Sequence, residues 1–264
     1  MADAVNALRR NDLTGAEALI RKRLATDPED LEAARLLAGV AAMTGSSADA
    51  EALLRRAIAR APAFVLAYAD LVSLLCRLDR AEEAIALLDN VIEDPSRRLW
   101  ALSLKTTLLA GERRVEEALH VHKQLVARAP GAAVPWMNYG YALKTAGRLE
   151  DAVVAYRRSL KIDPANSFAW LGLANLRTVH LGSDDVTLLE RALEAVRDDV
   201  QRIHLHFALG KALGDLNQFE LSFRQYQMAN DIRGCQSASK RDPRSACKRD
   251  PTAAWRSVDV EREF

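Results

Sequence analysis

The chain has 264 residues, of which 49% are hydrophobic and 28% are charged, a composition typical of a folded soluble protein. Its formal net charge of +1 argues against a nucleic acid or an anionic membrane surface as the partner. Three cysteines without a close-spaced pair argue against a disulfide framework, and no stretch approaches the roughly 18 apolar residues of a membrane span.

The first half of the chain is predicted to form helical hairpins. Its N-terminal segment lacks the apolar core of a secretion signal, so the expected compartment is the cytoplasm. Short helices are predicted over 2–10 and 15–26, and these form a partial first unit at 1–30. Three full units follow, each read as two amphipathic helices joined by a turn. They cover residues 31–64, 65–98 and 99–132.

The next unit, at 133–166, has the clearest pattern. Its first helix carries a stripe at three- and four-residue spacing, namely Trp136, Tyr139, Gly140 and Leu143. Its second helix carries a similar stripe, namely Ala152, Tyr156 and Leu160. Because Gly140 and Ala152 are small, the two backbones can approach each other, and the larger residues fill the space above and below.

Two columns of this unit recur along the chain at a spacing of 34 residues. The small residue of the second helix gives the column Ala16, Ala50, Ala84, Ala118 and Ala152. The closing proline gives Pro28, Pro62, Pro95 (one residue before the expected position), Pro130 and Pro164. Two independent columns in one register indicate a tandem repeat.

This pattern resembles the tetratricopeptide repeat, a helix-turn-helix unit of 34 residues. The residues that carry the resemblance are Trp136, Tyr139, Gly140, Leu143, Ala152, Tyr156, Ser159 and Pro164. Ser159 stands where the family usually has alanine. The resemblance implies an all-α fold, an α-solenoid in which tandem helix-turn-helix repeats stack into a right-handed superhelix.

The register changes in the unit at 167–202. Here the 34-residue step lands on Val186 and Glu190 instead of a small residue and an aromatic one. A turn and helix start around Gly182 precede a predicted helix over 186–197. We therefore expect two helices with altered packing in this unit.

The pattern returns two residues late in a last unit at 203–234, where the array is expected to end. Asn217 is predicted to take the left-handed turn conformation that Gly147 takes earlier. The remaining residues, 235–264, form a polar segment with an internal eight-residue near-duplication. It has too few apolar residues to offset the entropy of ordering, so a disordered tail is expected.

We found no catalytic arrangement in the sequence. There is no Gly-rich phosphate loop, no Gly-x-Ser-x-Gly elbow and no His-Glu-x-x-His motif. His120 and His122 lie two residues apart on a helix, as do His204 and His206, which turns the rings of each pair about 200° away from each other. We therefore expect no catalytic residue, no metal site and no cofactor, and interpret the protein as a non-enzyme.

A stack of such units has a concave face, and the resemblance assigns this face to the first helix of each pair. Asn138 matches an asparagine that, in many members of the family, hydrogen-bonds the backbone of a bound peptide. The predicted groove residues are Arg35, Ser73, Trp100, Thr107, Asn138, Tyr141, Lys144, Phe168, Asn175 and Lys211. The expected partner is a protein or peptide, and the expected role is that of an adaptor. The alternative is that these residues are solvated polar groups on a curved surface.

Two other roles remain open. Residues 168–177, 206–213 and 226–230 resemble the last repeats of bacterial proteins that fuse such an array to a sulfotransferase domain. This resemblance implies a substrate-presenting module that lacks its catalytic domain. The other role is self-association through the apolar end of the array near Ile232.

Overall fold

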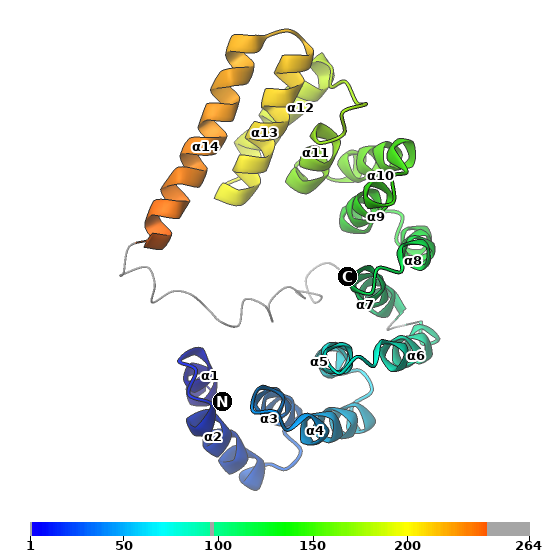
Figure 1. The fold of residues 1–264 in the computed structure, drawn as a ribbon, viewed down its shortest axis with the longest axis vertical. Helices are drawn as coiled ribbons and strands as arrows, with labels where there is room; N and C mark the ends of the chain where they lie inside the picture. The colour runs from blue at the N-terminus through cyan, green and yellow to red at the C-terminus, as the bar shows by residue number, and fades with distance from the viewer. Residues whose placement is uncertain (1, 96–97, 242–264) are drawn as a thin grey trace. The chain divides into compact units, whose positions relative to one another are not determined.

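The computed structural model describes residues 2–95 and 98–241 (Figure 1). Within these residues it contains fourteen helices and no strand, which confirms the predicted all-α fold of tandem helices. The helices are α1 (Ala2–Arg9), α2 (Leu13–Thr26), α3 (Leu31–Met43), α4 (Ser47–Arg60), α5 (Val65–Arg77), α6 (Ala81–Ile92), α7 (Arg98–Gly111), α8 (Val115–Arg128), α9 (Ala133–Thr145), α10 (Leu149–Ile162), α11 (Ser167–Ala174), α12 (Ser183–Ala195), α13 (Asp199–Asp215) and α14 (Phe219–Arg241).

The turns inside the hairpins repeat at the predicted spacing. A residue with a positive φ follows the first helix of each of the first five hairpins. These residues lie 34 apart and are Asn11 (60°), Gly45 (90°), Asp79 (57°), Arg113 (59°) and Gly147 (78°). Asn217, after the two-residue shift, has φ of 60°, which confirms the left-handed turn predicted there. The backbone thus keeps the repeat even where the side chain at this position is not glycine.

The chain divides into two compact units within α7. Unit 1 contains the described residues up to Leu104, and unit 2 begins at Lys105. In unit 2, α14 continues to Arg241, past the predicted end of the array at residue 234. The predicted disordered tail otherwise falls on residues 242–264, which lie outside the described residues. In the described part of the chain, no helix has the length and apolar character that crossing a membrane requires.

The alanine column and the two small residues of unit 133–166 lie at tight helix contacts. The five alanines of the column are at most 4% exposed. Tyr156 on α10 is 1% exposed, and its ring lies against two glycines on the neighbouring first helices. A Cβ at Gly140 of α9 would lie 2.8 Å from the ring, and a Cβ at Gly172 of α11 would lie 2.5 Å from it. Tyr156 therefore joins α9, α10 and α11 only because both partners lack a side chain.

The tryptophan and proline columns meet through a hydrogen bond that closes each repeat. Nε1 of Trp136 donates to the carbonyl oxygen of Pro130 at 3.1 Å, and Nε1 of Trp170 donates to that of Pro164 at 2.8 Å. Ser159, the departure from the family pattern, is fully buried, and its hydroxyl donates to the Ala133 carbonyl at 2.9 Å. A polar side chain is accommodated there because it satisfies a helix-end carbonyl group.

The two-residue shift results from a shortened first helix. α11 ends at Ala174, and α12 begins at Ser183, three residues before the predicted start at 186. Asp185 accepts a hydrogen bond from the Gly182 amide at 3.1 Å and from Nη2 of Arg157 on α10 at 2.9 Å. The start of α12 is thus fixed to α10 by a charge-assisted contact.

The segment between α11 and α12 is held by α13. Nζ of Lys211 donates to the Val179 carbonyl at 2.6 Å and forms an ion pair with Asp215. Asp215 in turn accepts a hydrogen bond from the Leu181 amide at 2.8 Å. These contacts give the irregular segment partners for its backbone polar groups.

Candidate functional site

The predicted groove residues of unit 1 are engaged in internal contacts. Nε and Nη2 of Arg35 donate to the Glu32 carboxylate at 2.9 and 2.6 Å, and Nη1 donates to Asp70 of α5 at 2.9 Å. Burial raises the pKa of Asp70, although the charge of Arg35 acts in the opposite direction. Trp100 is 8% exposed and packs against Tyr68, with ring centroids 5.5 Å apart. The structure therefore places Trp100 in the core and not among exposed anchors.

In unit 2, the exposed group with the clearest geometry lies on α9. Tyr141 is 60% exposed, and Nζ of Lys144 lies 5.2 Å from the centroid of its ring. This is within the range of a cation–π contact. Among the described residues no carboxylate pairs with Lys144, so its positive charge is available to a ligand.

The other predicted groove residues differ in how accessible they are. Asn138 is half-buried, and its side chain makes no hydrogen bond within the described residues. Ser73, Thr107 and Asn175 are exposed. Lys211 is committed to the segment after α11 and is not a free groove cation.

The exposed aromatic group of α9 continues onto α11, α13 and α14. Phe168 on α11 is 51% exposed, and its ring lies edge-on to that of His204 at 4.7 Å. Phe207, one turn further along α13, lies under the guanidinium of Arg233 at 5.0 Å. Burial and the charge of Arg233 lower the pKa of His204. The sequence analysis missed His204, which a 34-residue step plus the two-residue shift reaches from Phe168.

We call these six residues the aromatic–basic face of unit 2: Tyr141, Lys144, Phe168, His204, Phe207 and Arg233. Tyr156 connects its parts from below, because Gly140 directly precedes Tyr141 and Gly172 follows Phe168 by one turn. Burial raises the pKa of Tyr156 to about 12, so its hydroxyl stays protonated and can act as a donor.

Acidic side chains are scarce around the aromatic–basic face. Residues 133–149 and 165–182 contain neither aspartate nor glutamate. On α13 the acidic residues lie at the ends, and Asp215 is paired with Lys211. On α14, Asp231 is exposed. The face therefore carries a local excess of positive charge in a chain whose net charge is close to zero.

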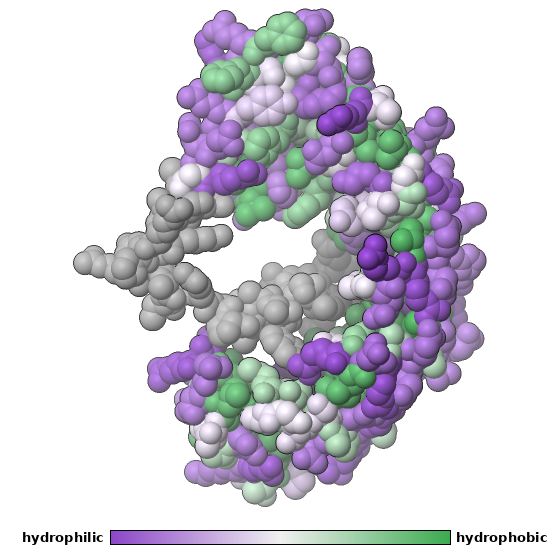
Figure 2. All heavy atoms as spheres, viewed as in Figure 1, coloured by the Kyte–Doolittle hydropathy of each residue, from purple (hydrophilic) through white to green (hydrophobic). Residues whose placement is uncertain are grey.

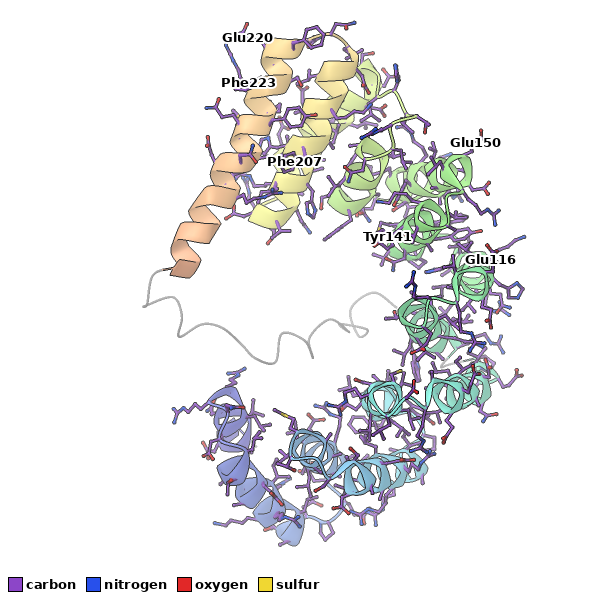
Figure 3. The ribbon with its side chains drawn as sticks, in the orientation of Figure 1. Glu116, Tyr141, Glu150, Phe207, Glu220 and Phe223 are labelled. Carbon is purple, nitrogen blue, oxygen red and sulfur yellow. The ribbon has the colours of Figure 1, made fainter. Side chains whose placement is uncertain are left out.

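The opposite side of unit 2 has a different character. Tyr141 projects from one side of this unit, while Glu116 of α8 and Glu150 of α10 project from the other (Figure 3). The surface over α8 and α10 is largely hydrophilic (Figure 2). Both glutamates are exposed, so this side offers matched control positions for the aromatic–basic face.

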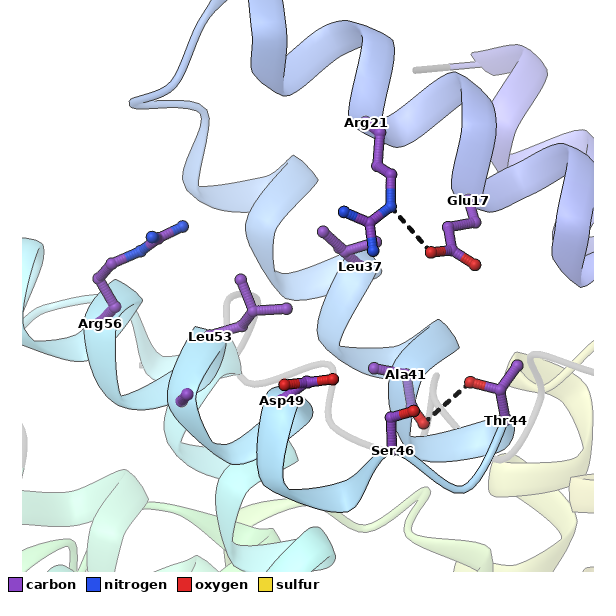
Figure 4. A pocket seen from close by; sticks show the side chains of 10 residues that line it. Glu17, Arg21, Leu37, Ala41, Thr44, Ser46, Asp49, Leu53 and Arg56 are labelled. Carbon is purple, nitrogen blue, oxygen red and sulfur yellow. Dashed lines mark hydrogen bonds and ion pairs between the residues drawn. The ribbon is translucent and has the colours of Figure 1, made fainter.

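A pocket in unit 1 lies outside the predicted groove. It has a volume of about 500 Å³ and an apolar floor that includes Leu37 and Leu53, between α2, α3 and α4 (Figure 4). Arg21 and Arg56 lie at its rim, and Arg21 is paired with Glu17 at 2.8 Å. Its lining residues come from different columns of the repeat, so no single spacing in the sequence indicates it. In the part of the chain that the structure describes, no cluster of three potential metal ligands occurs.

Comparisons with known proteins match the repeat pattern. Models of the tetratricopeptide repeat family match residues 2–63, 44–98 and 133–176. No curated protein matches the chain in sequence.

Solved structures of repeat proteins are also similar. A tetratricopeptide repeat protein from Parabacteroides merdae is 13% identical, and the match covers 88% of this chain and 91% of that one with a TM-score of 0.49. YrrB, described as a TPR protein with an unusual peptide-binding site, is 21% identical over 63% of this chain and 86% of its own, with a TM-score of 0.42. The human IFIT1 dimer with m7Gppp-AAAA is 16% identical over 83% of this chain and 55% of its own, with a TM-score of 0.48.

Proposed function

Because the chain belongs to the tetratricopeptide repeat family, we propose that it is a non-catalytic adaptor that binds a protein or peptide segment on the aromatic–basic face of unit 2. Stacked helical repeats commonly use the surface formed by their first helices to bind extended partners. On this view unit 2 supplies the main contacts, and Asn138 orients the bound backbone.

The observation that carries the proposal is the set of exposed aromatic rings on successive first helices. Tyr141 and Phe168 leave more than half of their surface exposed, although each lies beside a well-packed core. A folded chain gains no stability from such exposure, whereas aromatic side chains are the commonest energetic anchors of protein interfaces. Asn138, with no internal hydrogen-bond partner among the described residues, adds a donor and an acceptor beside them.

The test is capture of a partner by the full chain, compared with the double variant Asn138→Ala and Tyr141→Ala. Because Tyr141 is mostly exposed and Asn138 makes no internal hydrogen bond, the fold should be nearly unaffected. Removal of an anchor should cost roughly 2 kcal/mol of binding free energy, or about 30-fold in Kd. The measurement is a lysate pull-down, followed by calorimetric titration of the identified segment into both proteins.

The matched control is the double variant Glu116→Ala and Glu150→Ala on the opposite side of unit 2 (Figure 3). It should capture the same partner with unchanged affinity. Equal loss of binding in both variants, or no loss in either, would contradict the proposal. Circular dichroism of each variant separates a lost contact from a lost fold.

A second candidate function is self-association through α14, and one observation favours it. Phe219 and Phe223 follow Leu149 and Val153 of α10 by 70 residues, and these two partly buried residues of α10 pack against the core of unit 2. On α14 the corresponding rings are 67% and 68% exposed, and apolar atoms reach the surface at the start of this helix (Figure 2). A second copy of the chain would cover this surface.

If this candidate is correct, the mass measured by sedimentation equilibrium should rise with protein concentration. The double variant Phe219→Glu and Phe223→Glu should keep the monomer mass throughout, since it places like charges in the contact. Gln227→Glu, an exposed change on the same helix, serves as the control and should associate like the wild type. A wild-type mass that stays monomeric at all concentrations would exclude this role.

The resemblance to repeat regions fused to sulfotransferases stays a prediction from the sequence. Neither the family models nor the structures reported above bear on it.

A further inference from the structure

The three exposed or half-exposed rings of the aromatic–basic face share a feature beyond their position. Each has a basic side chain against it: Lys144 at Tyr141, His204 at Phe168 and Arg233 at Phe207. We infer that this face recognises an acidic polypeptide segment that carries apolar side chains between its carboxylates. This inference rests on the proposed function and specifies the chemistry of its partner.

The geometry of Tyr141 and Lys144 provides two adjacent kinds of contact. The ammonium lies 5.2 Å from the ring centroid, so an apolar side chain that packs on the exposed part of the ring places its neighbours close to the ammonium. A carboxylate at that point forms a charge-assisted hydrogen bond, which is shorter and stronger than a neutral one. A segment with alternating acidic and apolar side chains satisfies both contacts at once.

The distribution of charge selects against a basic segment. The stretches 133–149 and 165–182 contain no carboxylate that could pair with a lysine or arginine of the partner. Asp215 is already paired with Lys211, and Asp231 is the acidic residue of α14 nearest to Arg233 in sequence. A basic partner would therefore meet Lys144 and Arg233 without compensation, and such like-charge contacts cost several kcal/mol.

A nucleic acid is a less suitable occupant of the same surface. Its rings would stack on Tyr141 and Phe168, but its affinity would depend on neutralising many phosphates. The face has few cations, and the other side of unit 2 presents Glu116 and Glu150. The small number of positive charges matches a short acidic peptide better than a polyanion.

The inference is tested on the full chain with a fluorescein-labelled peptide of alternating glutamate and phenylalanine. Matched peptides carry glutamine or lysine in place of glutamate, and single-stranded oligouridine is the nucleic-acid probe. By fluorescence anisotropy, the glutamate peptide should bind at least about tenfold more tightly than the glutamine peptide at low ionic strength. Raising the salt concentration should reduce that difference.

Two variants locate the effect. Lys144→Gln should weaken binding of the glutamate peptide about fivefold and leave the glutamine peptide unaffected. Lys123→Gln removes an exposed lysine of α8 beside Glu116 and should change neither affinity.

Each other result overturns the inference. Equal binding of the glutamate and glutamine peptides, with both lost in the Asn138→Ala and Tyr141→Ala variant, would mean an uncharged partner and would leave the proposed function intact. Preference for the lysine peptide, or failure of every peptide to bind, would also overturn it, and the lysate capture then decides the proposed function separately. Binding of oligouridine alone would contradict both.

Discussion

Replacing Gly172 by alanine should destabilise unit 2 by about 1–3 kcal/mol, although alanine is the better helix former. The added Cβ would lie 2.5 Å from Cζ and 2.6 Å from Cε1 of Tyr156. Tyr156 is 1% exposed, so its ring has no free space into which it can move. The strain should force α10 and α11 apart and loosen the junction beneath the aromatic–basic face. The measurement is urea unfolding with the loss of helical signal as the readout.

Gly39→Ala is the matched control, because Gly39 also lies inside a helix but a Cβ there would have nothing within 4 Å. It should stabilise unit 1 by roughly 0.5–1 kcal/mol, the ordinary helix preference of alanine over glycine. The same glycine-to-alanine change thus has opposite signs at the two sites. Equal effects at Gly39 and Gly172 would show that the contact with Tyr156 does not determine the result.

A double-mutant cycle identifies Tyr156 as the cause. In a Tyr156→Leu background the two ring carbons nearest to the new Cβ are absent, so Gly172→Ala should become neutral or favourable. Additive destabilisation in the double variant would instead indicate that position 172 is sensitive for another reason. Since repeats interact mainly with their neighbours, the loss should be concentrated in α9 to α11, where hydrogen exchange can follow it.

The regular part of this fold could be predicted from the sequence because it depends on small residues at fixed spacing. Ala152 lies fully buried at its tight contact, and Gly140 packs against Tyr156 as its column required. Asn217 adopts the left-handed turn because the local backbone demands it. Such features follow from steric limits that act within one repeat, and one sequence is enough to reveal them.

The parts that could not be predicted depend on contacts between repeats. A 34-residue step assigned Trp100 and Phe168 to the same position, but Trp100 packs on Tyr68 while Phe168 stays exposed. Lys211 was expected in the groove, yet it pairs with Asp215, because α11 is shortened and the segment after it needs polar partners. Column position identifies the side of a helix, whereas the partner of each side chain depends on how neighbouring helices end.

For the same reason the sequence indicated the site only in part. Tyr141 and Lys144 were found as separate groove residues, and their contact at 5.2 Å became evident only in the structure. Phe207 and Arg233 lie on different helices of the last hairpin and share no column, so no spacing rule links them. Pairing of aromatic rings with bases is a property of the assembled face and not of any one repeat.

The stability of unit 2 should fall as the pH is lowered from about 6.5 to about 4, and His122 should account for up to about 3 kcal/mol of that loss. His122 on α8 is 7% exposed and stacks on Tyr139 at 6.0 Å, and its buried Nδ1 has no hydrogen-bond partner. Burial lowers its pKa from 6.5 to about 4. Between these values the unfolded chain binds a proton that the folded chain does not, so lower pH favours unfolding.

The variant His122→Leu should remove this contribution. Leucine suits the site, because the chain itself has the fully or nearly buried Leu54 and Leu88 at the equivalent positions of α4 and α6. It also eliminates the unsatisfied ring nitrogen, which should add roughly 1–3 kcal/mol of stability at neutral pH. The measurement is the free energy of unfolding in urea at intervals between pH 4 and 8, for the wild type and the variant.

His120→Gln is the control on the same helix, since His120 is exposed and its ring contacts Gln124. Its stability should follow the wild-type pH profile, while that of His122→Leu should be flatter between pH 4 and 6.5. Parallel profiles for all three proteins would mean that His122 gains a proton in the folded state as easily as in the unfolded one. A histidine has then replaced the aromatic or leucine side chain of this column without a cost at low pH, and the acid sensitivity of unit 2 must come from its carboxylates.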